Sequence, residues 1–222
     1  MKNIKNLSFL LAILAFPSAL SAAVLTESAT APGSAIISQA DFSGGFNGNL
    51  DYSDNSGAPA QSFTTGALPF TLGAVTVKGA GSSGGLSTVT WTISLSTVSA
   101  GVLTVIAQET TNTLAITSSS NYLTFTLDTP VALAASTVYA YSIYESGSFY
   151  AFAKSSANDY AGGEAFNHGS AKRMVATGDL VMNPQAVDRT FYLQAIPEPS
   201  TYALMAVALG GLVIVRKRFR KA

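Results

Sequence analysis

The residues best suited to nucleophilic catalysis in this sequence are one serine and the only histidine. Ser83 occupies the central position of a G-x-S-x-G pattern at residues 81–85, the pattern of a hydrolase nucleophile elbow. An elbow needs a strand before the serine and a helix after it, but residues 86–98 alternate as a strand does. His168 stands in a glycine- and polar-rich segment typical of a solvated loop. We therefore expect a glycine-serine turn at Ser83, no catalytic residues, and a protein that is not an enzyme.

Asp51 and Asp54 are the weak candidates for a metal site. They lie in a glycine-rich loop whose oxygen ligands suit calcium, but the spacing follows the calcium-loop pattern only in part, and no glutamate stands at the twelfth position. An Asx-turn loop explains the same residues. A zinc site would need several nitrogen or sulfur ligands, whereas the chain has one histidine and no cysteine. We expect neither a metal nor a cofactor.

Aromatic and acidic side chains leave two carbohydrate-related interpretations open. The aromatic residues of the later part of the chain are Tyr139, Tyr141, Tyr144, Phe149, Tyr150, Phe152 and Tyr160. Rings on an exposed face would stack on sugars, whereas Tyr139 and Tyr141 can equally belong to the core. Hydrolysis of a polysaccharide would need two carboxylates about 5–9 Å apart. The available carboxylates are Asp41, Asp51, Asp128, Glu145 and Glu164, and their spacing selects no pair.

The composition points to a single domain with apolar ends. The chain has 222 residues, a mean hydropathy of +0.33 and only 11% charged residues, and its hydrophobicity is concentrated at the two termini. Between residues 24 and 196, five lysines and arginines stand against eleven carboxylates. An acidic body of this kind repels phosphate backbones, so we expect no binding to nucleic acid.

The middle of the chain has the period-two pattern of β-strands. Trp91, Ile93 and Leu95 alternate with threonine and serine, which predicts a half-buried antiparallel strand. The same alternation recurs at residues 123–128 and 139–143, and short polar turns separate the runs. These patterns predict an all-β domain over residues 24–195, an antiparallel β-sandwich or jelly-roll-like ectodomain.

The N-terminus has the three parts of a secretory signal peptide. Lys2 and Lys5 are followed by an apolar run at residues 7–16, and Pro17 precedes the small residues 21–23. Residues 1–23 are therefore predicted to be a signal helix that directs the chain to the Sec translocon and is removed by signal peptidase.

The C-terminus, residues 196–222, combines a proline-glutamate-proline triplet, an apolar segment and a basic cluster. Pro197, Glu198 and Pro199 precede a predicted transmembrane helix from Tyr202 to Val215. This helix would be about 21 Å long against a hydrocarbon core of about 30 Å, a gap that flanking side chains can close. The basic cluster consists of Arg216, Lys217, Arg218, Arg220 and Lys221, and it is expected to stay in the cytoplasm.

This arrangement resembles the PEP-CTERM sorting signal of Gram-negative bacteria. The resemblance implies that an exosortase, a membrane cysteine transpeptidase-like enzyme, recognises Pro197, Glu198 and Pro199 as its substrate. It also implies a precursor anchored in the inner membrane, a final place on the cell surface or in the extracellular matrix, and a bacterium that secretes exopolysaccharide.

The body has a looser resemblance, carried by residues 61–66, 72–77 and 133–139. These segments are similar to choice-of-anchor surface domains, most nearly the R type, over residues 34–195. We therefore expect a non-catalytic envelope protein associated with exopolysaccharide or biofilm matrix. A lectin-like adhesin and a secreted polysaccharide hydrolase remain as alternatives.

Overall fold

A computed structural model describes residues 22–43, 46–47, 58–83, 88–145, 149–168, 180–184 and 187–196 of the chain. The predicted signal helix lies outside these residues except at its last two positions. The calcium candidates Asp51 and Asp54, the triplet Pro197, Glu198 and Pro199, the predicted membrane helix from Tyr202 to Val215 and the basic cluster also lie outside them.

Every regular element in the described part of the chain is a β-strand, which confirms the all-β prediction. The strands are β1 (Ala22–Ser28), β2 (Ile37–Gln39), β3 (Phe46–Asn47), β4 (Ala58–Thr64), β5 (Phe70–Ser83), β6 (Thr88–Val89), β7 (Trp91–Ser99), β8 (Val102–Thr111), β9 (Leu114–Ala115), β10 (Tyr122–Leu133), β11 (Val138–Glu145), β12 (Phe149–Ala153), β13 (Ala165–His168), β14 (Leu180–Pro184) and β15 (Phe191–Ala195).

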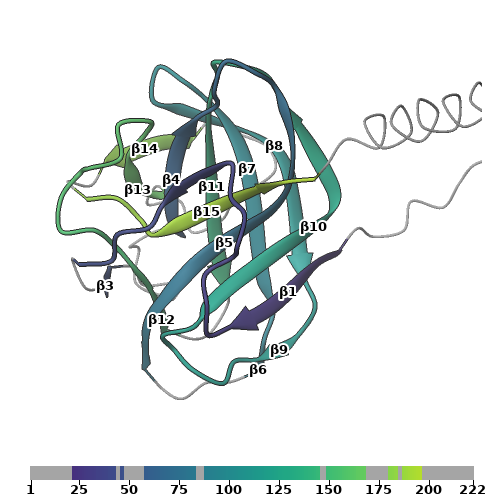
Figure 1. The fold of residues 1–222 in the computed structure, drawn as a ribbon, viewed down its shortest axis with the longest axis vertical. Helices are drawn as coiled ribbons and strands as arrows, with labels where there is room; N and C mark the ends of the chain where they lie inside the picture. Colours follow the sequence, from purple (N-terminus) through teal and green to yellow (C-terminus); the bar gives the residue numbers. More distant parts are fainter. Residues whose placement is uncertain are drawn as a thin grey trace, which may run out of the picture.

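Thirteen of these strands form one large, mostly antiparallel sheet (Figure 1). Its order is β14-β13-β4-β11-β7-β8-β1-β10-β5-β12-β3, with β15 between β5 and β2, while β6 and β9 pair separately. The strand β1 joins the two halves, because Ala22 and Ala23 pair in parallel with β8 and the following residues pair antiparallel with β10. The sheet can therefore bend at β1 without an interruption in its hydrogen bonding.

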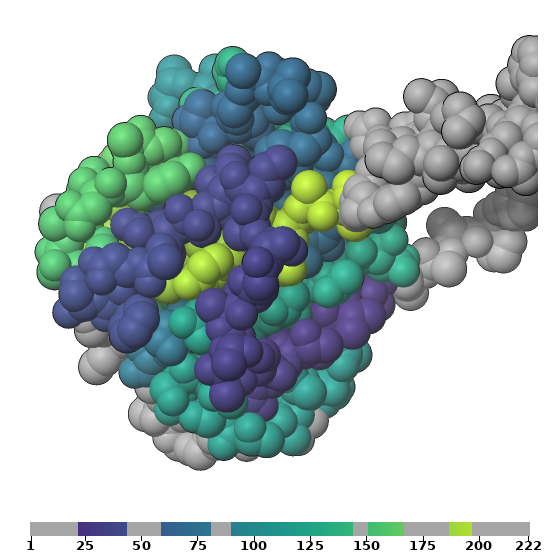
Figure 2. All heavy atoms as spheres, in the orientation of Figure 1, coloured from purple at the N-terminus to yellow at the C-terminus, as the bar shows by residue number. Residues whose placement is uncertain are grey.

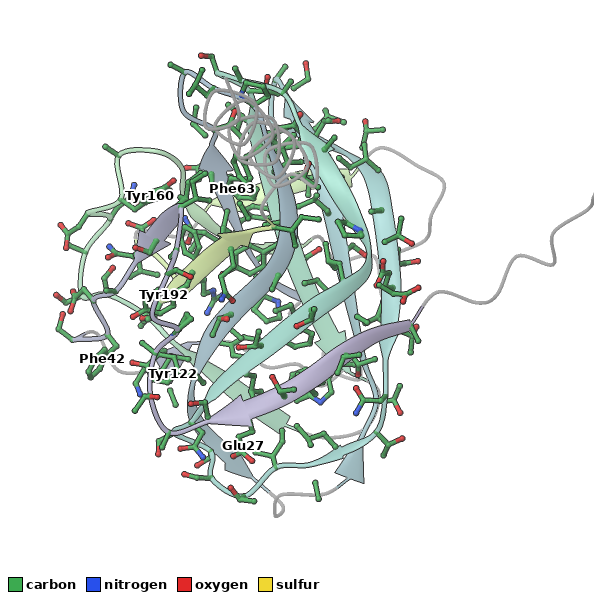
Figure 3. All side chains as sticks on the ribbon, turned by 45° about the vertical axis from the view of Figure 1, so that its right-hand side comes forward. Glu27, Phe42, Phe63, Tyr122, Tyr160 and Tyr192 are labelled. Atoms are coloured by element: carbon green, nitrogen blue, oxygen red, sulfur yellow. The ribbon has the colours of Figure 1, made fainter. Side chains whose placement is uncertain are left out.

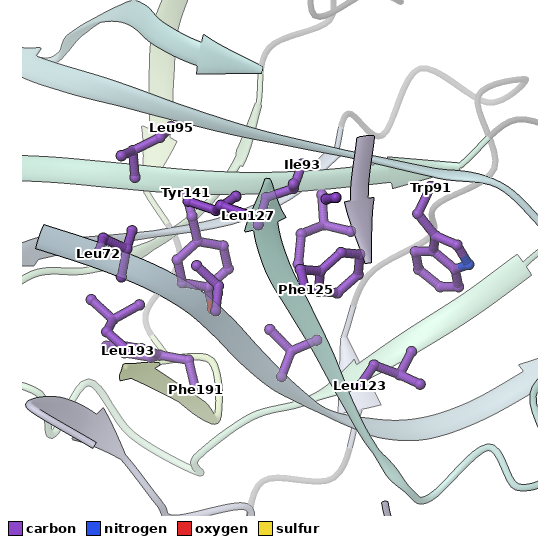
Figure 4. Close-up of a cluster of buried hydrophobic side chains, with 14 of the residues drawn as sticks. Leu72, Trp91, Ile93, Leu95, Leu123, Phe125, Leu127, Tyr141, Phe191 and Leu193 are labelled. Atoms are coloured by element: carbon purple, nitrogen blue, oxygen red, sulfur yellow. The ribbon is translucent and has the colours of Figure 1, made fainter. Parts of the chain in front are cut away.

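The two halves of the sheet face each other across a hydrophobic core (Figure 4). Trp91 of β7 meets Phe125 of β10 with ring centroids 6.0 Å apart, and Tyr141 of β11 meets Phe191 of β15 at 5.7 Å. None of these strands pair with one another across the core, so the contacts hold the two halves together through side chains. Burial of each large side chain stabilises the fold by about 1.5–3 kcal/mol.

The predicted half-buried character of the Trp91 strand is wrong. Thr92, Ser94 and Ser96 on its polar side are 8%, 1% and 2% exposed, so β7 is covered on both faces. The reason is that β14 pairs with both β13 and β8, which closes a circuit of strands β8, β7, β11, β4, β13 and β14. This circuit encloses a second, smaller core of Ala60, Leu103, Ala140 and Phe166. Small polar side chains fit this narrow space because larger ones would overpack it.

The described chain begins and ends on the same side of the domain (Figure 1). Val24, Thr126, Ala74 and Gln194 are successive partners in one row across β1, β10, β5 and β15. Three strand spacings separate the first from the last, or about 14 Å. The predicted domain boundary at residue 23 falls inside β1, since Ala22 and Ala23 already belong to this strand.

Candidate functional site at the tail junction and on the domain surface

The junction with the C-terminal tail is built on an internal strand. β15 pairs with β5 on one side and with β2 on the other, and its Phe191 and Leu193 are fully buried in the core. The Ile196 amide then donates a hydrogen bond of 3.0 Å to the carbonyl of Thr71. The residue that precedes the proline-glutamate-proline triplet is therefore still bonded to the sheet.

Gly73 explains how Ile196 lies so close to β5. A Cβ built on Gly73 would collide with Cγ2 of Ile196, so only glycine leaves room for this contact. Ile196 itself is 37% exposed and marks the outer limit of the packed body. The sorting triplet thus begins without a linker after the folded domain.

A second feature is a surface cluster of Lys78, Phe42, Tyr122 and Tyr192, which we call the Lys78 cluster. Figure 3 labels its three aromatic residues. The Lys78 ammonium lies 4.9 Å from the ring centroid of Phe42 and 4.4 Å from that of Tyr122, and it donates a 3.0 Å hydrogen bond to the Ser120 carbonyl. Tyr122 in turn meets Tyr192 edge to face at 5.9 Å. Stacking on the rings orders the lysine and stabilises its charge.

The chain between β1 and β3 covers this cluster in part. Residues 29–43 run across the surface beside β15, as Figure 2 shows, and carry Phe42, whose ring is 53% exposed. Tyr122 and Tyr192 are each only 9% exposed beneath. Burial, the proximity of Tyr122 and a hydrogen bond with it raise the pKa of Tyr192 to about 12, so this hydroxyl stays protonated at neutral pH. Phe42 is the part of the cluster that a ligand could reach.

The predicted aromatic face is mostly core. Tyr139, Tyr141 and Phe152 are 5%, 2% and 2% exposed, which confirms the interpretation of Tyr139 and Tyr141 as core residues. Tyr160 is half-buried and packs edge-on against Phe191 at 5.3 Å. The side chains of Tyr144, Phe149 and Tyr150 lie outside the described residues.

Two of the candidate or buried carboxylates in the described chain, Glu109 and Asp41, accept hydrogen bonds from nearby protein groups. Glu109 is buried and accepts hydrogen bonds from the amides of Asp128 and Thr129 at 2.8 and 3.0 Å, which ties β8 to the irregular part of β10. It also borders a cavity of about 10 Å³, room for about one water molecule. Asp41 is exposed, and hydrogen bonds from Ser43 lower its pKa.

A buried polar centre lies where β4, β11 and β15 meet. Asp188 accepts hydrogen bonds from the Gln61 amide side chain at 3.1 Å and from the Tyr160 backbone amide at 2.7 Å. The side-chain oxygen of Gln61 accepts a hydrogen bond of 2.8 Å from the backbone N–H of Arg189. Burial lowers the pKa of Arg189 to about 10, with Tyr141 acting in the opposite direction, so the guanidinium remains charged. The centre fixes the position of the chain that leads into β15.

The candidates for catalysis and metal binding are not brought together in the described residues. Ser83 ends β5, and the next described elements, β6 and β7, are strands, which does not match a nucleophile elbow. His168 ends β13, and its side chain lies outside the described part, as does that of Glu145. Among the described side chains, no group of three or more histidines or carboxylates is placed to hold a metal ion.

The sequence patterns did not reveal the Lys78 cluster or the buried polar centre. Lys78 and Tyr122 are neighbours only through the register of β5 against β10, and Phe42 arrives from a segment without regular periodicity. Asp188 and Arg189 are fully buried, although two adjacent charged residues are seldom buried, so local patterns do not indicate their place in the core.

The fold and the junction define an all-β domain that ends in a C-terminal sorting motif. Residues 195–221 match the family model of the PEP-CTERM protein-sorting motif. The motif implies an exported cell-surface protein that is sorted by an exosortase. The match does not extend to the body, whose family stays unidentified. No curated protein and no solved structure matches the chain.

The described residues contain no helix with the length and apolar character needed to cross a membrane. The predicted helix from Tyr202 to Val215 is not among them.

Proposed function

We propose that this chain is a non-catalytic cell-envelope protein whose β domain is delivered to the cell surface and associates there with exopolysaccharide or biofilm matrix. The Sec translocon and signal peptidase act on the N-terminal segment, and an exosortase acts on Pro197, Glu198 and Pro199. Before this processing, the segment from Tyr202 to Val215 anchors the precursor in the inner membrane, with the basic cluster in the cytoplasm.

One observation carries the proposal: the matched motif begins at residue 195, the last residue of β15. The motif overlaps the sheet only at Ala195 and at Ile196, whose amide is bonded to Thr71. The triplet and the residues after it follow the sheet, so the tail can be processed without disrupting the fold. This arrangement suits a folded domain that is followed by a separate sorting signal.

The burial and hydrogen bonding of two carboxylates support a structural role for the domain. Glu109 and Asp188 are buried and occupied by donors from the protein, and neither is placed like the acid of a glycoside hydrolase. The proposed two-layer sandwich, related to choice-of-anchor domains, would present loops and edge strands as its contact surface.

A carbohydrate-binding adhesin is the second candidate, because of the Lys78 cluster. Phe42 offers an exposed ring beside a lysine ammonium and the Tyr122 ring, which together suit an acidic sugar through stacking and charge. This candidate keeps the same route of export and adds a ligand.

The sorting proposal is tested by cell fractionation and intact-mass analysis of the wild-type chain beside a variant with Pro197→Ala, Glu198→Ala and Pro199→Ala. We expect the wild type to lose both ends and reach the surface, and the variant to accumulate in the membrane with its tail attached. Full-length wild-type protein free in the cytosol would overturn the proposal.

The two roles of the body are separated by a pull-down with the exopolysaccharide of the producing strain. Binding that falls with Phe42→Ala but survives a matched Leu68→Ala change favours the adhesin. Turnover of the polysaccharide, abolished by one carboxylate substitution, would overturn the non-catalytic assignment.

A further inference from the structure

The end of the domain from which the tail leaves has no charged residue in its turns. Three turns and the chain exit meet there: residues 65–69 between β4 and β5, 99–101 between β7 and β8, 134–137 between β10 and β11, and 195–196 after β15. We call this set the exit end. Its residues are threonine, glycine, alanine, leucine, proline, serine and isoleucine only.

Hydrogen bonds and register place these segments together (upper part of Figure 1). The amide of Thr65 donates to the carbonyl of Thr137 at 3.0 Å, and the amide of Ser136 donates to that of Gly66 at 2.9 Å. Tyr139 pairs with Thr97 just before the 99–101 turn, and Ile196 is bonded to Thr71 beside the start of β5. The segments thus form one surface and are not scattered over the domain.

The exit end also carries exposed apolar side chains. Leu68 is 78% exposed at the tip of its turn and Ile196 is 37% exposed, and Val138, directly after the 134–137 turn, is also 37% exposed. The far end of the domain differs, because Glu27, Asn112 and Asn121 gather there with serines and threonines.

The length of the tail brings the exit end close to the predicted membrane helix. Only residues 197–201 separate Ile196 from Tyr202, so the two Cα atoms can be at most about 20 Å apart in an extended chain. The two prolines restrict this linker further.

We propose that the exit end is a lipid-contact surface: in the membrane-anchored precursor it rests on the outer face of the bilayer, with Leu68 at the interface. The proposal rests on the proposed function, because the tail must first be in the membrane. Turns without charged side chains can approach lipid head groups without leaving an ion of their own desolvated, and anionic lipids repel them less than they would repel the acidic remainder of the body. The tether makes the contact intramolecular, so a small apolar tip suffices. A protein partner would be expected to need directional polar groups, and among the hydroxyls of these turns those of Thr65 and Thr137 already donate to backbone carbonyls within the domain.

The absence of cysteine from the chain allows a direct test. A single fluorescent probe is attached to the full-length chain through Ala67→Cys beside an intact Leu68, or through Thr113→Cys at the far end as the matched control. A third variant, Ala208→Cys, reports insertion of the tail. Each is reconstituted in vesicles of phosphatidylethanolamine and phosphatidylglycerol that contain a lipid-bound quencher.

We expect quenching at position 67 that is severalfold greater than at position 113 and that falls when Leu68→Asp is added. Equal, low quenching at 67 and 113 with a strongly quenched probe at 208 would overturn the lipid contact and leave the sorting proposal intact. No quenching at 208 would overturn membrane anchoring itself, and the lipid contact with it. A probe at 67 that stays in water in these vesicles but is shielded in membranes containing the exosortase would overturn the lipid assignment in favour of that protein.

Discussion

Ile196 lies directly over Gly73, so the residue before the sorting triplet packs on a glycine of β5. The same isoleucine is bonded through its amide to Thr71. The folded domain therefore extends to the border of the tail, and the contact can be tested by changing the size of either partner.

Gly73→Ala is expected to destabilise the domain by about 1–3 kcal/mol, because the added methyl group collides with the Ile196 side chain. The measurement is urea unfolding of the full chain in mild detergent, followed by the fluorescence of Trp91, the only tryptophan and a fully buried one. Adding Ile196→Ala should restore part of the loss. An equal loss with and without Ile196→Ala would show that the collision is not the cause.

Removal of the hydroxyl group should change the stability of the domain differently at two buried tyrosines. The Tyr139 hydroxyl accepts a 3.0 Å hydrogen bond from the Ala134 amide, so Tyr139→Phe should cost about 1 kcal/mol. The Tyr141 hydroxyl is buried without a hydrogen-bond partner among the described residues, and its burial raises its pKa well above the usual range. Tyr141→Phe should therefore leave stability unchanged or raise it by up to about 1 kcal/mol.

The measurement is the same urea titration, carried out on both variants side by side. A Tyr141→Phe variant that loses as much stability as Tyr139→Phe would contradict the prediction and would point to a partner for the Tyr141 hydroxyl.

Glu27 should make the stability of the domain depend on pH. Its carboxylate accepts five hydrogen bonds of 2.8–3.0 Å from Thr117, Ser118 and Asn121, which fasten β1 to the chain before β10. Partial burial raises the pKa of Glu27, but these hydrogen bonds outweigh it and hold the pKa below the usual 4.5. A depressed pKa in the folded state means that the stabilisation is complete above 4.5 and is lost as the pH falls through the folded value.

Glu27→Gln should therefore cost about 1 kcal/mol at neutral pH, after allowance for solvent screening, and progressively less below pH 4.5. Unfolding curves of both proteins at several pH values measure this difference. A gap between wild type and variant that stays constant down to strongly acidic pH would exclude the carboxylate as its origin.

The mature protein should begin at Ala22. Ala23 is fully buried, and its carbonyl accepts a hydrogen bond of 3.2 Å from the Asn112 amide. Ala22 and Ala23 also form the parallel pairing of β1 with β8. Cleavage after Ser21, with Ala19 and Ser21 as the small residues that signal peptidase requires, preserves this pairing, whereas cleavage after Ala23 removes it. N-terminal sequencing of the exported protein decides between the two, and a sequence starting at Val24 would refute the prediction.

The alternation of apolar and polar residues predicted the strands well where one face meets the main core. Leu123, Phe125 and Leu127 are buried as expected because period two maps directly onto the two faces of a strand. The same rule failed at Ser94 and Ser96, since closure of the circuit by β14 depends on pairing between residues far apart in the chain.

In the candidate site, too, local sequence patterns predicted one feature and missed the others. The sorting motif is a linear pattern and is legible in the sequence, and the family match to residues 195–221 confirms it. The Lys78 cluster depends on the register of β5 against β10 and on a crossing segment, neither of which local patterns specify. The contact of Ile196 with Gly73 likewise joins positions that only the folded sheet brings together.

The place of β15 inside the sheet sets the order of events during export. In a polypeptide that crosses the membrane amino terminus first, β15 is the last strand to be translocated. Both β5 and β2 lack their pairing partner until it arrives. The domain therefore completes its core only when the sorting motif that follows β15 has reached the membrane. A chain interrupted earlier would have an incomplete sheet and no sorting motif.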